Sequence, residues 1–363
     1  MRSEGATAGA PLAEILEQSA LNAQEVQLDP GAVVAALGEH HGFAGTLKRI
    51  ATEKDDTFVL APSTSVRGGV AGRTRLLVKV SSSYEDPQFV DLQSEVLDHI
   101  AAADPSLPVP RIIPALDGRS GVPCFAGSGA FVRVLRVLTF LEGEPMGAGP
   151  TTARQRAATG ELLAGSSLAL ADFTHPAAGR LMAWDIQHFP ALAPLLDTVE
   201  DPALRGEIER QMEQYAERIL PRLPEVRFQV VHNDLNRHNV LVAGERAIAG
   251  IIDFGDAVRT AIPFDLAIGA AGHLSPVGDP WAQSLDVIRG YLTKRPLTAP
   301  EIEMAVRAAP VRIALRALLT CYQSSSNPQR AEYLNSHDSN NLAILRAVAN
   351  VRAEAALAQL PPS

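Results

Sequence analysis

Apolar and polar positions follow two different patterns along this chain of 363 residues. Before residue 150, short apolar runs bounded by turn-forming residues predict strands over 46–51, 57–61, 74–80, 109–116 and 130–141. In the same part, apolar residues three or four positions apart predict helices over 10–23, 30–38 and 91–103. After residue 150 the helical spacing dominates, over 151–173, 201–219, 279–292, 300–324 and 339–360.

This order of elements predicts an α+β protein in which a β-rich lobe precedes a mainly α-helical lobe. The sequence Glu-Gly-Glu-Pro at 142–145 interrupts the apolar pattern and indicates a hinge. The helix over 10–23 is expected to pack on the outside of the first lobe, and the glycine-rich segment 62–73 to form an exposed hairpin loop. The predicted boundaries are an N-terminal extension at 1–25, an N-lobe at 26–142 and a C-lobe at 143–363.

One stretch of the helical half reads as strands and carries most of the candidate chemistry. Residues 230–257 read VVHNDLNRHNVLVAGERAIAGIIDFGDA. A strand enters a polar loop at 232–239, a second strand follows, and turn residues at 243–246 lead into a third strand that returns to Asp253. This hairpin brings Asp253 back beside Asn239.

The polar residues of this hairpin match the needs of phosphoryl transfer. That reaction requires one carboxylate to orient the attacking hydroxyl and two oxygen ligands to hold Mg²⁺ on the nucleotide. Asp234, Asn239 and Asp253 supply these parts in that order, and His232 is expected to brace the loop by hydrogen bonds. A single His-x-Asp or Asp-Phe-Gly is common and often structural, but together and in this order they indicate a kinase-type site.

The β-rich half offers residues for the nucleotide. Lys79, between two valines on the third predicted strand, is expected to reach the α- and β-phosphates, although an edge lysine facing solvent has the same pattern. Glu95 on the next helix is the best placed partner for this lysine, ahead of Asp98 and Asp91. The loop at 52–58 lacks the glycine-rich motif of protein kinases. We therefore expect backbone N–H groups, Lys54 and Thr57 to hold the phosphates, and the base to stack in the predicted cleft between the lobes, near Phe140 and Leu141.

Composition excludes several other classes of protein. The net charge of −9 is opposite to the basic face that nucleic-acid-binding proteins usually present. The two cysteines, Cys124 and Cys321, are far apart and have no metal-ligand spacing, which is typical of a reducing compartment. No apolar run approaches the ~20 residues of a membrane span, and no apolar segment typical of a signal peptide follows the N-terminus. We therefore expect a cytoplasmic protein.

From residue 42 to residue 291 the sequence resembles the aminoglycoside phosphotransferase/choline kinase superfamily, and within it the hydroxylysine-kinase-like branch. The segments that carry the resemblance are GTL at 45–47, EKD at 53–55, DLQ at 91–93, DPSLPVP at 104–110, HP at 175–176, WD at 184–185 and GIIDFGD at 250–256. The resemblance implies a bilobal protein-kinase-like fold, with Asp234 as catalytic base, Asn239 and Asp253 as metal ligands and Lys79 as phosphate ligand. It also implies Mg²⁺ with ATP or GTP, and a small hydroxylated substrate that bears an amine, such as 5-hydroxylysine.

The sequence departs from the kinase pattern at several positions. Asn236 replaces the lysine that many protein kinases place two residues after the base, and we expect Arg237 to contact the γ-phosphate instead. Asn233 stands where many relatives have glycine. No Ala-Pro-Glu segment follows Asp253, and no activation loop has room before Asp265, which favours a small-molecule substrate over a protein.

Several residues of the C-lobe are candidates for binding the substrate. A cationic amine requires a carboxylate, and Asp172, Asp185 and Asp256 are available; Asp265 is another, although it is equally suited to capping the helix that begins there. Trp184 either forms a wall of the pocket or fills the core. A substrate carboxylate would be bound by an arginine, for which the candidates are Arg312 and Arg316, one turn apart on a helix. His175 and His273 have no evident role.

Three alternatives to an amino-alcohol kinase remain at this point. An antibiotic phosphotransferase uses the same chemistry on a polycationic acceptor, which the negative charge of the chain permits. A catalytically inactive nucleotide-binding module is disfavoured because every chemical element of the site is present. A metal-dependent hydrolase built on His232, Asp234 and His238 lacks a second His/Asp pair.

Overall fold

The computed structural model describes residues 11–21, 23, 25–52, 54–63, 75–244, 247–326 and 340–360. The chain forms two compact units. The sheet unit comprises Ala23–Glu142 and His175–Ala178, and the helical unit comprises Met1–Asn22, Gly143–Thr174 and Gly179–Ser363. Most of the loop predicted at 62–73, and residues 245–246 of the predicted hairpin turn, lie outside the described residues.

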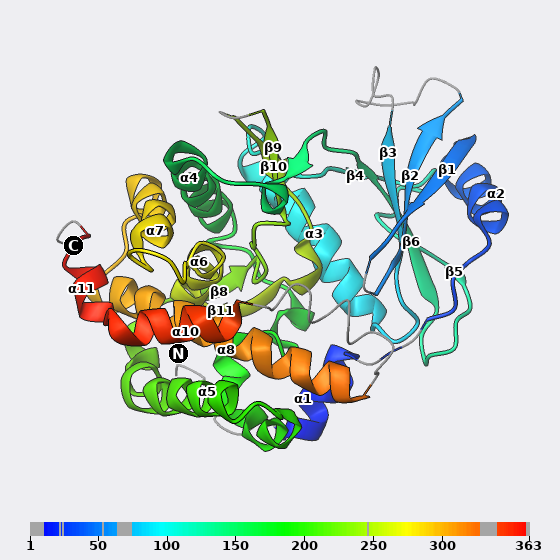
Figure 1. The fold of residues 1–363 in the computed structure, drawn as a ribbon. Helices are drawn as coiled ribbons and strands as arrows, with labels where there is room; N and C mark the ends of the chain where they lie inside the picture. Colours follow the sequence, from blue (N-terminus) through cyan, green and yellow to red (C-terminus); the bar gives the residue numbers. More distant parts are fainter. Residues whose placement is uncertain are drawn as a thin grey trace. The chain divides into compact units, whose positions relative to one another are not determined.

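The sheet unit is an antiparallel sheet with one helix on each face (Figure 1). Its strands are β1 (Gly45–Ile50), β2 (Asp56–Pro62), β3 (Leu76–Val80), β4 (Ile112–Ile113), β5 (Val122–Phe125) and β6 (Arg133–Thr139), and its helices are α2 (Pro30–His41) and α3 (Pro87–Ala103). The strand order is β1-β2-β3-β6-β4, and β5 pairs with β6. The strand predicted over 109–116 is reduced to two residues, because Pro108 and Pro110 disturb its start.

The two faces of this sheet differ in chemistry. Alternate residues of β3, including Val78, pack with α2 in the apolar core. Lys79 therefore lies on the opposite face, where Gln93 of α3 accepts a hydrogen bond from Arg136 of β6 at 2.8 Å. Arg136 is the register partner of Lys79 across the β3–β6 pair. The sheet thus presents two cationic residues to one face and an apolar core to the other.

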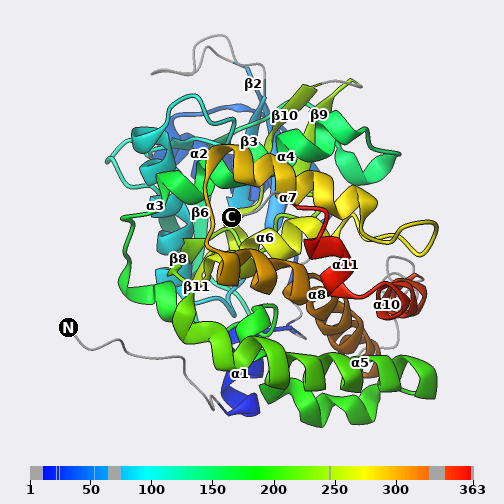
Figure 2. The same cartoon turned by 90° about the vertical axis from the view of Figure 1, so that its left-hand side faces the viewer.

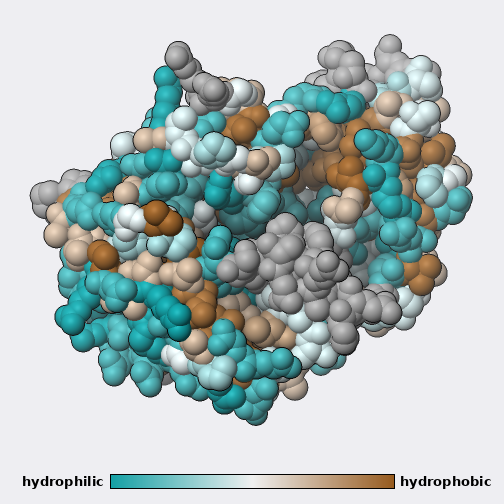
Figure 3. Space-filling view, viewed as in Figure 1, coloured by the Kyte–Doolittle hydropathy of each residue, from teal (hydrophilic) through white to brown (hydrophobic). Residues whose placement is uncertain are grey.

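The helical unit packs its helices around a small number of short strands (Figure 2). Its helices are α1 (Leu12–Ser19), η1 (Met146–Ala148), α4 (Ala153–Ala169), η3 (Ile186–Thr198), α5 (Pro202–Gln214), η4 (Tyr215–Ile219), η5 (Leu220–Glu225), η6 (Phe254–Asp256), α6 (Ile262–Ala271), α7 (Ala282–Lys294), α8 (Ala299–Ser326), α10 (Asn341–Asn350) and α11 (Ala353–Leu357); η2 (Pro176–Gly179) lies at the junction of the units. The outward face of α5 is hydrophilic (Figure 3). Among the residues described above, no helix combines the length and hydropathy that crossing a membrane requires.

Two helical predictions need correction. Helix α1 belongs to the helical unit, so the expected packing on the β-rich lobe is wrong. The side chains at its end are the reason: Ser19 Oγ accepts a hydrogen bond from Ala183 N at 2.7 Å, and Gln18 Oε1 accepts one from Leu181 N at 2.9 Å. The helix predicted over 201–219 is α-helical only to Gln214 and continues as the π-helical turn η4.

The hairpin predicted over 230–254 is confirmed, with one difference in pairing. Strands β9 (Val240–Ala243) and β10 (Ala247–Ile251) pair antiparallel, and β7 (Glu144–Pro145) adds to β9. The strand before the loop, β8 (Phe228–Val231), instead pairs with β11 (Val258–Ala261). The polar loop at 232–239 therefore connects two different small sheets.

Candidate active site

The loop at 232–239 is held in a strained backbone conformation by a buried carboxylate. Asn233 has φ of 63°, a left-handed conformation that asparagine adopts more readily than most residues and glycine adopts freely. Its backbone N–H donates to Asp265 Oδ1 of α6 at 2.8 Å, and Asp265 is buried. The N-cap of α6 is Ala261. The expectation that Asp265 caps its own helix is therefore wrong, because its side chain positions the loop instead.

His232 braces the loop as expected. Its Nδ1 accepts a hydrogen bond from Asp234 N at 3.2 Å, and its Nε2 lies 3.0 Å from the carbonyl oxygen of Ile252. These contacts require a neutral ring with the proton on Nε2. Burial lowers the pKa of His232 and so favours this form. His232 thus ties the start of the loop to the end of β10, one residue before Asp253.

Both oxygens of the Asp234 carboxylate accept hydrogen bonds. Oδ1 accepts a hydrogen bond from Arg312 Nη2 of α8 at 2.9 Å. Oδ2 accepts from Asn239 Nδ2 at 2.8 Å and from Asn236 Nδ2 at 3.1 Å. These hydrogen bonds fix the direction of the carboxylate. The Asp234 side chain keeps 25% of its surface accessible, so a substrate hydroxyl can still reach it.

The groups around Asp234 shift its pKa in opposite directions. Burial raises its pKa, the Arg312 guanidinium lowers it, and the carboxylates of Asp256 and Asp253 raise it again, to about 7. A carboxylate with a pKa near neutrality is suited to accepting a proton during the reaction. Three acidic side chains, Asp234, Asp253 and Asp256, therefore share this part of the helical unit, and Arg312 offsets part of their effect on Asp234.

Asn239 and Asp253 offer the oxygen ligands that a hard divalent cation requires. The Asn239 amide nitrogen donates to both the backbone oxygen and Oδ2 of Asp234, each at 2.8 Å, which turns the amide oxygen away from that carboxylate. Ile252 N donates to the Asn239 carbonyl at 2.9 Å and draws the end of β10 to the loop. Asp253 is exposed and has φ of 64°. An amide oxygen and an exposed carboxylate fit the ligand chemistry of Mg²⁺.

Arg237 does not take the place expected for it. Its Nη2 donates to the Gly149 carbonyl at 2.6 Å, and its own carbonyl accepts from Gly147 N at 2.9 Å. These contacts hold the turn that follows β7. The predicted contact with the γ-phosphate is therefore wrong, because the guanidinium is directed into the protein backbone.

The residues predicted to bind the substrate differ in burial and in their distance from Asp234. Asp185 is fully buried and accepts hydrogen bonds from Thr260 Oγ1 at 2.9 Å and from Gln187 N at 3.1 Å, so its expected substrate role is wrong. Trp184 is half-buried and lies beside the site, with the Arg312 guanidinium 5.2 Å from its ring. Asp256 is half-buried and lies near enough to Asp234 to raise the pKa of that carboxyl. Asp172 is exposed beyond the end of α4.

In the sheet unit, Lys79 has an acidic neighbour that differs from the predicted one. Its Nζ lies 3.2 Å from Asp55 Oδ2. Glu95 is half-exposed, and its carboxylate lies 3.9 Å from His175 Nε2 instead. The predicted Lys79–Glu95 pair is therefore wrong. At ~100° per residue, Glu95 lies on the side of α3 opposite Gln93, which faces the sheet.

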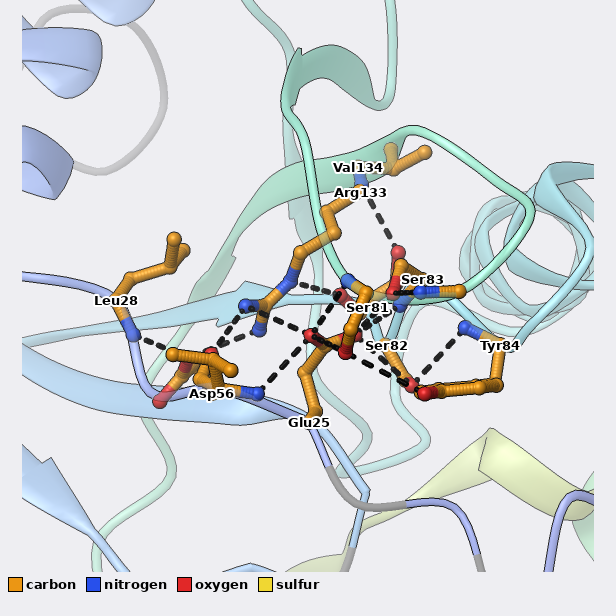
Figure 4. Close-up of polar contacts among 12 residues, drawn as sticks. Glu25, Leu28, Asp56, Ser81, Ser82, Ser83, Tyr84, Arg133 and Val134 are labelled. Atoms are coloured by element: carbon orange, nitrogen blue, oxygen red, sulfur yellow. Dashed lines mark hydrogen bonds and ion pairs between the residues drawn. The ribbon is translucent and has the colours of Figure 1, made fainter.

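Buried charges also anchor the chain immediately after β3 (Figure 4). Arg133 of β6 is almost fully buried and donates to Asp56 Oδ2 and to the Ser81 carbonyl, at 2.9 Å and 2.8 Å. Glu25 accepts a hydrogen bond from Ser83 N at 2.6 Å. These contacts attach the loop after β3 to the segment that precedes α2. Because each buried charge has a partner, the network positions β3 without leaving an uncompensated ion.

The remaining nucleotide candidates lie at the two ends of the same sheet. Thr57 is buried and accepts a hydrogen bond from Thr52 Oγ1 at 3.2 Å, and Lys54 is half-buried in the preceding loop. At the other end Leu141 is half-buried, and the Arg75 guanidinium lies 4.5 Å from the ring of Phe140. The roles of these residues in nucleotide binding stay predictions.

Asp91, Glu95 and His175 place one ligand atom each within 4.8 Å of one another. The histidine is turned the wrong way for a metal, however. Its Nδ1 accepts a hydrogen bond from Ala177 N at 3.1 Å. The proton of a neutral ring therefore lies on Nε2, the atom that faces the carboxylates, and a metal ligand must be deprotonated there. The arrangement is typical of a polar contact that fixes His175 to α3.

Two contacts of the candidate residues were not predicted from the sequence, those of Arg312 with Asp234 and of Lys79 with Asp55. Arg312 was expected to bind a substrate carboxylate but binds Asp234, and no local pattern relates residues 78 positions apart. The contact of Asp55 with Lys79 did have a signal. Thr57 and Lys79 are register partners in β2 and β3, so an acidic residue two positions before Thr57 falls on the same side of the sheet.

The geometry described above defines a class of protein. Within the helical unit, a carboxylate fixed by hydrogen bonds and two further oxygen-bearing side chains on a strand–loop–hairpin are typical of a kinase-type phosphotransferase. The chain belongs to the phosphotransferase enzyme family (APH), whose sequence profile matches residues 62–300. It is a small-molecule kinase that acts on a hydroxyl group, and the predicted superfamily is confirmed.

Individual relatives support this assignment. Hydroxylysine kinase of Mus musculus is 25% identical over 272 residues, which cover 71% of this chain and 72% of the relative. Homoserine kinase of Hyphomonas neptunium is 32% identical over 202 residues, 51% of this chain and 57% of the relative. A solved microcompartment-associated aminopropanol kinase has a TM-score of 0.65 at 19% identity, over 89% of this chain and 99% of that one. A spectinomycin phosphotransferase complex with ADP has a TM-score of 0.57 at 15% identity, over 89% and 99%. The predicted protein-kinase-like fold is confirmed.

Proposed function

We propose that this kinase transfers the γ-phosphoryl group of ATP or GTP to the hydroxyl of an amino alcohol or a hydroxylated amino acid. The observation that carries the proposal is the Asp234 carboxylate, which is held on both oxygens and remains partly accessible. In this arrangement Asp234 orients the acceptor hydroxyl for in-line attack on the γ-phosphorus and accepts its proton.

Asn239 and Asp253 are the residues that would hold a divalent cation, and we propose Mg²⁺. Both supply oxygen atoms, and neither offers the imidazole nitrogen or thiolate sulfur that softer metals prefer. When bound, the cation neutralises charge on the phosphates. Within the sheet unit, the ammonium of Lys79 is proposed to contact the α- and β-phosphates. The Asn239 amide nitrogen is held by Asp234, so its oxygen does not face that carboxylate.

The acidic surroundings of Asp234 support an amine-bearing acceptor. Asp256 is half-buried, and its charge is close enough to influence Asp234. A cationic amine on the acceptor would compensate this charge, whereas a neutral sugar would not. Trp184 offers an aromatic surface beside the same carboxylate. The names of the relatives, hydroxylysine kinase and homoserine kinase, agree with this substrate class.

An acceptor screen tests the proposal. The protein is incubated with Mg²⁺ and either ATP or GTP, together with 5-hydroxylysine, homoserine, 1-amino-2-propanol, a neutral sugar or spectinomycin. Release of nucleoside diphosphate is measured and the product identified by phosphorus NMR. We expect turnover that depends on a small amine-bearing alcohol. Turnover with spectinomycin alone would favour an antibiotic phosphotransferase, and turnover with the neutral sugar alone would refute the amine-bearing class.

A further inference from the structure

The helical unit contains a cavity of about 360 Å³ between α5, η4, α8, α10 and α11. Helices α5, α8, α10 and α11 lie side by side in both ribbon views (Figures 1 and 2). The residues that line the cavity, all from the described part of the chain, include none of those assigned above to phosphoryl transfer. Helix α8 contributes Arg307 to the cavity and Arg312 to Asp234. Five residues separate them, so they point about 140° apart around the helix.

The lining of this cavity is strongly basic, although the whole chain carries a net charge of −9. Four arginines face it, against the single carboxylate of Glu354. Two of them already have acidic partners: Arg307 lies 2.8 Å from Glu354, and Arg210 lies 2.6 Å from Glu207.

The other two, Arg218 and Arg352, have no ion pair with any residue that the structure describes, and both are exposed. The cavity therefore holds two guanidinium groups that form no ion pair within the described part of the chain, although the carboxylate of Glu354 offsets part of the charge of Arg352. Arginine presents a planar set of donors that matches phosphate and carboxylate groups with two hydrogen bonds each.

The local backbone is also unusual at this place. The regular α5 ends at Gln214, and the chain continues as a π-helical turn from Tyr215 to Ile219. Such turns are rare and occur frequently at functional sites. Gln214 and Arg218 both line the cavity from this segment. Trp281 also lines it; this residue is almost fully buried, and its indole N–H donates to the Val351 carbonyl at 2.8 Å.

We propose that this cavity binds a compact polyanion, a small molecule with two or three phosphate or carboxylate groups. Its volume lies near the lower end of the range of about 300–1,000 Å³ for small-molecule sites. The two arginines without an ion pair to a described residue, Arg218 and Arg352, bind one anionic group each. The proposal is independent of the acceptor that the kinase uses, because the site shares no residue with the catalytic hairpin.

Calorimetric titration of the full-length protein with pyrophosphate and with citrate, at constant ionic strength and without divalent metal, tests this site. The two probes distinguish a phosphate from a carboxylate ligand. We expect saturable binding of at least one probe, and none of chloride. Arg218→Gln and Arg352→Gln should each weaken it about tenfold or more. Arg346→Gln, which removes an exposed arginine of α10 outside the lining, should leave it unchanged.

The tryptophans locate the binding site. The chain has only two, Trp184 beside Asp234 and Trp281 in the cavity. In a Trp184→Phe variant, the fluorescence of Trp281 should change along the same titration curve. Absence of saturable binding, equal weakening by Arg346→Gln, or binding that neither cavity variant weakens would overturn the proposal. If thermal unfolding shows that one cavity variant is destabilised, the binding measured with the other cavity variant tests the proposal. If the Trp184→Phe variant does not fold, calorimetry with the arginine variants tests it.

Discussion

Replacing Arg312 with glutamine should slow phosphoryl transfer while the protein stays folded. Arg312 donates to Asp234 Oδ1 at 2.9 Å and to the Trp184 carbonyl at 2.6 Å, and its side chain is 11% exposed. A hydrogen bond to a charged group contributes about 1.5–3 kcal/mol. If that energy holds Asp234 in its reactive direction, the loss of this hydrogen bond lowers kcat by about 10- to 150-fold.

The pH dependence provides a second measure of the same contact. The Arg312 guanidinium lowers the pKa of Asp234, against the effect of burial. Its removal raises that pKa. Because Asp234 must be deprotonated to act as a base, the acidic limb of the rate profile should move to higher pH in Arg312→Gln. Arg312→Lys keeps the charge and should show a smaller movement.

Steady-state kinetics with the acceptor found by screening measure both effects. Arg316→Gln is the matched control, since Arg316 lies one turn further along α8 and donates to Asn341 Oδ1 at 2.5 Å. A rise in the KM of the acceptor with kcat unchanged would show that Arg312 binds substrate instead of positioning Asp234. A wild-type kcat and pH profile in Arg312→Gln would refute the positioning role altogether.

Three further changes test the metal site, a buried ion pair and the helix packing. Asp253→Asn keeps a residue that tolerates the left-handed backbone but removes the charge, and it should weaken Mg²⁺-dependent nucleotide binding about tenfold or more in calorimetry. Glu301→Gln should lower the free energy of unfolding by about 2 kcal/mol at pH 7 in urea. Burial raises the pKa of Glu301, but hydrogen bonds from Arg227 outweigh this effect and lower it from 4.5 to about 2, which corresponds to about 3 kcal/mol before allowance for the half-exposed arginine. Since the folded-state pKa is the lower one, this contribution is complete above pH 4.5 and disappears as the pH falls toward 2. Gly160→Ala should cost at least about 2 kcal/mol, because a Cβ there would lie 2.0 Å from the Val287 carbonyl oxygen of α7.

Each of these predictions has a distinct contrary outcome. Unchanged Mg²⁺ dependence in Asp253→Asn would remove this residue from the metal site. A stability difference for Glu301→Gln that is as large at pH 3 as at pH 7 would exclude a charged interaction. Gly206→Ala on α5 is the control for Gly160, because a Cβ at Gly206 meets no atom within 4 Å. If both alanine variants unfold at the same urea concentration, the packing of α4 against α7 does not require glycine at position 160.

The parts of the site that depend on local sequence could be predicted. The loop, the hairpin and the order of Asp234, Asn239 and Asp253 lie within 20 residues of one another, and turn residues determine how that segment folds back. The strand that carries Lys79 followed from a short apolar run bounded by turn-forming residues. These features do not depend on how distant elements pack.

The predictions that failed depended on helix rotation or on distant contacts. Glu95 and Gln93 are two residues apart, and only the packing of α3 decides which one faces the sheet. Arg237 was placed by analogy with a kinase lysine, but the Gly149 carbonyl binds its guanidinium. The contact of Arg312 with Asp234 joins residues of α8 and the catalytic loop, and no periodicity in the chain indicates it.

The most direct test of the catalytic assignment is the turnover of Asp234→Asn with the acceptor that supports activity in the wild type. The substitution preserves shape and replaces only the base. We expect acceptor-dependent release of nucleoside diphosphate to fall by about 10²-fold or more, while calorimetry shows Mg²⁺-dependent nucleotide binding within about threefold of the wild type. Acceptor-dependent turnover at the wild-type rate in Asp234→Asn would contradict the role of Asp234 as the base.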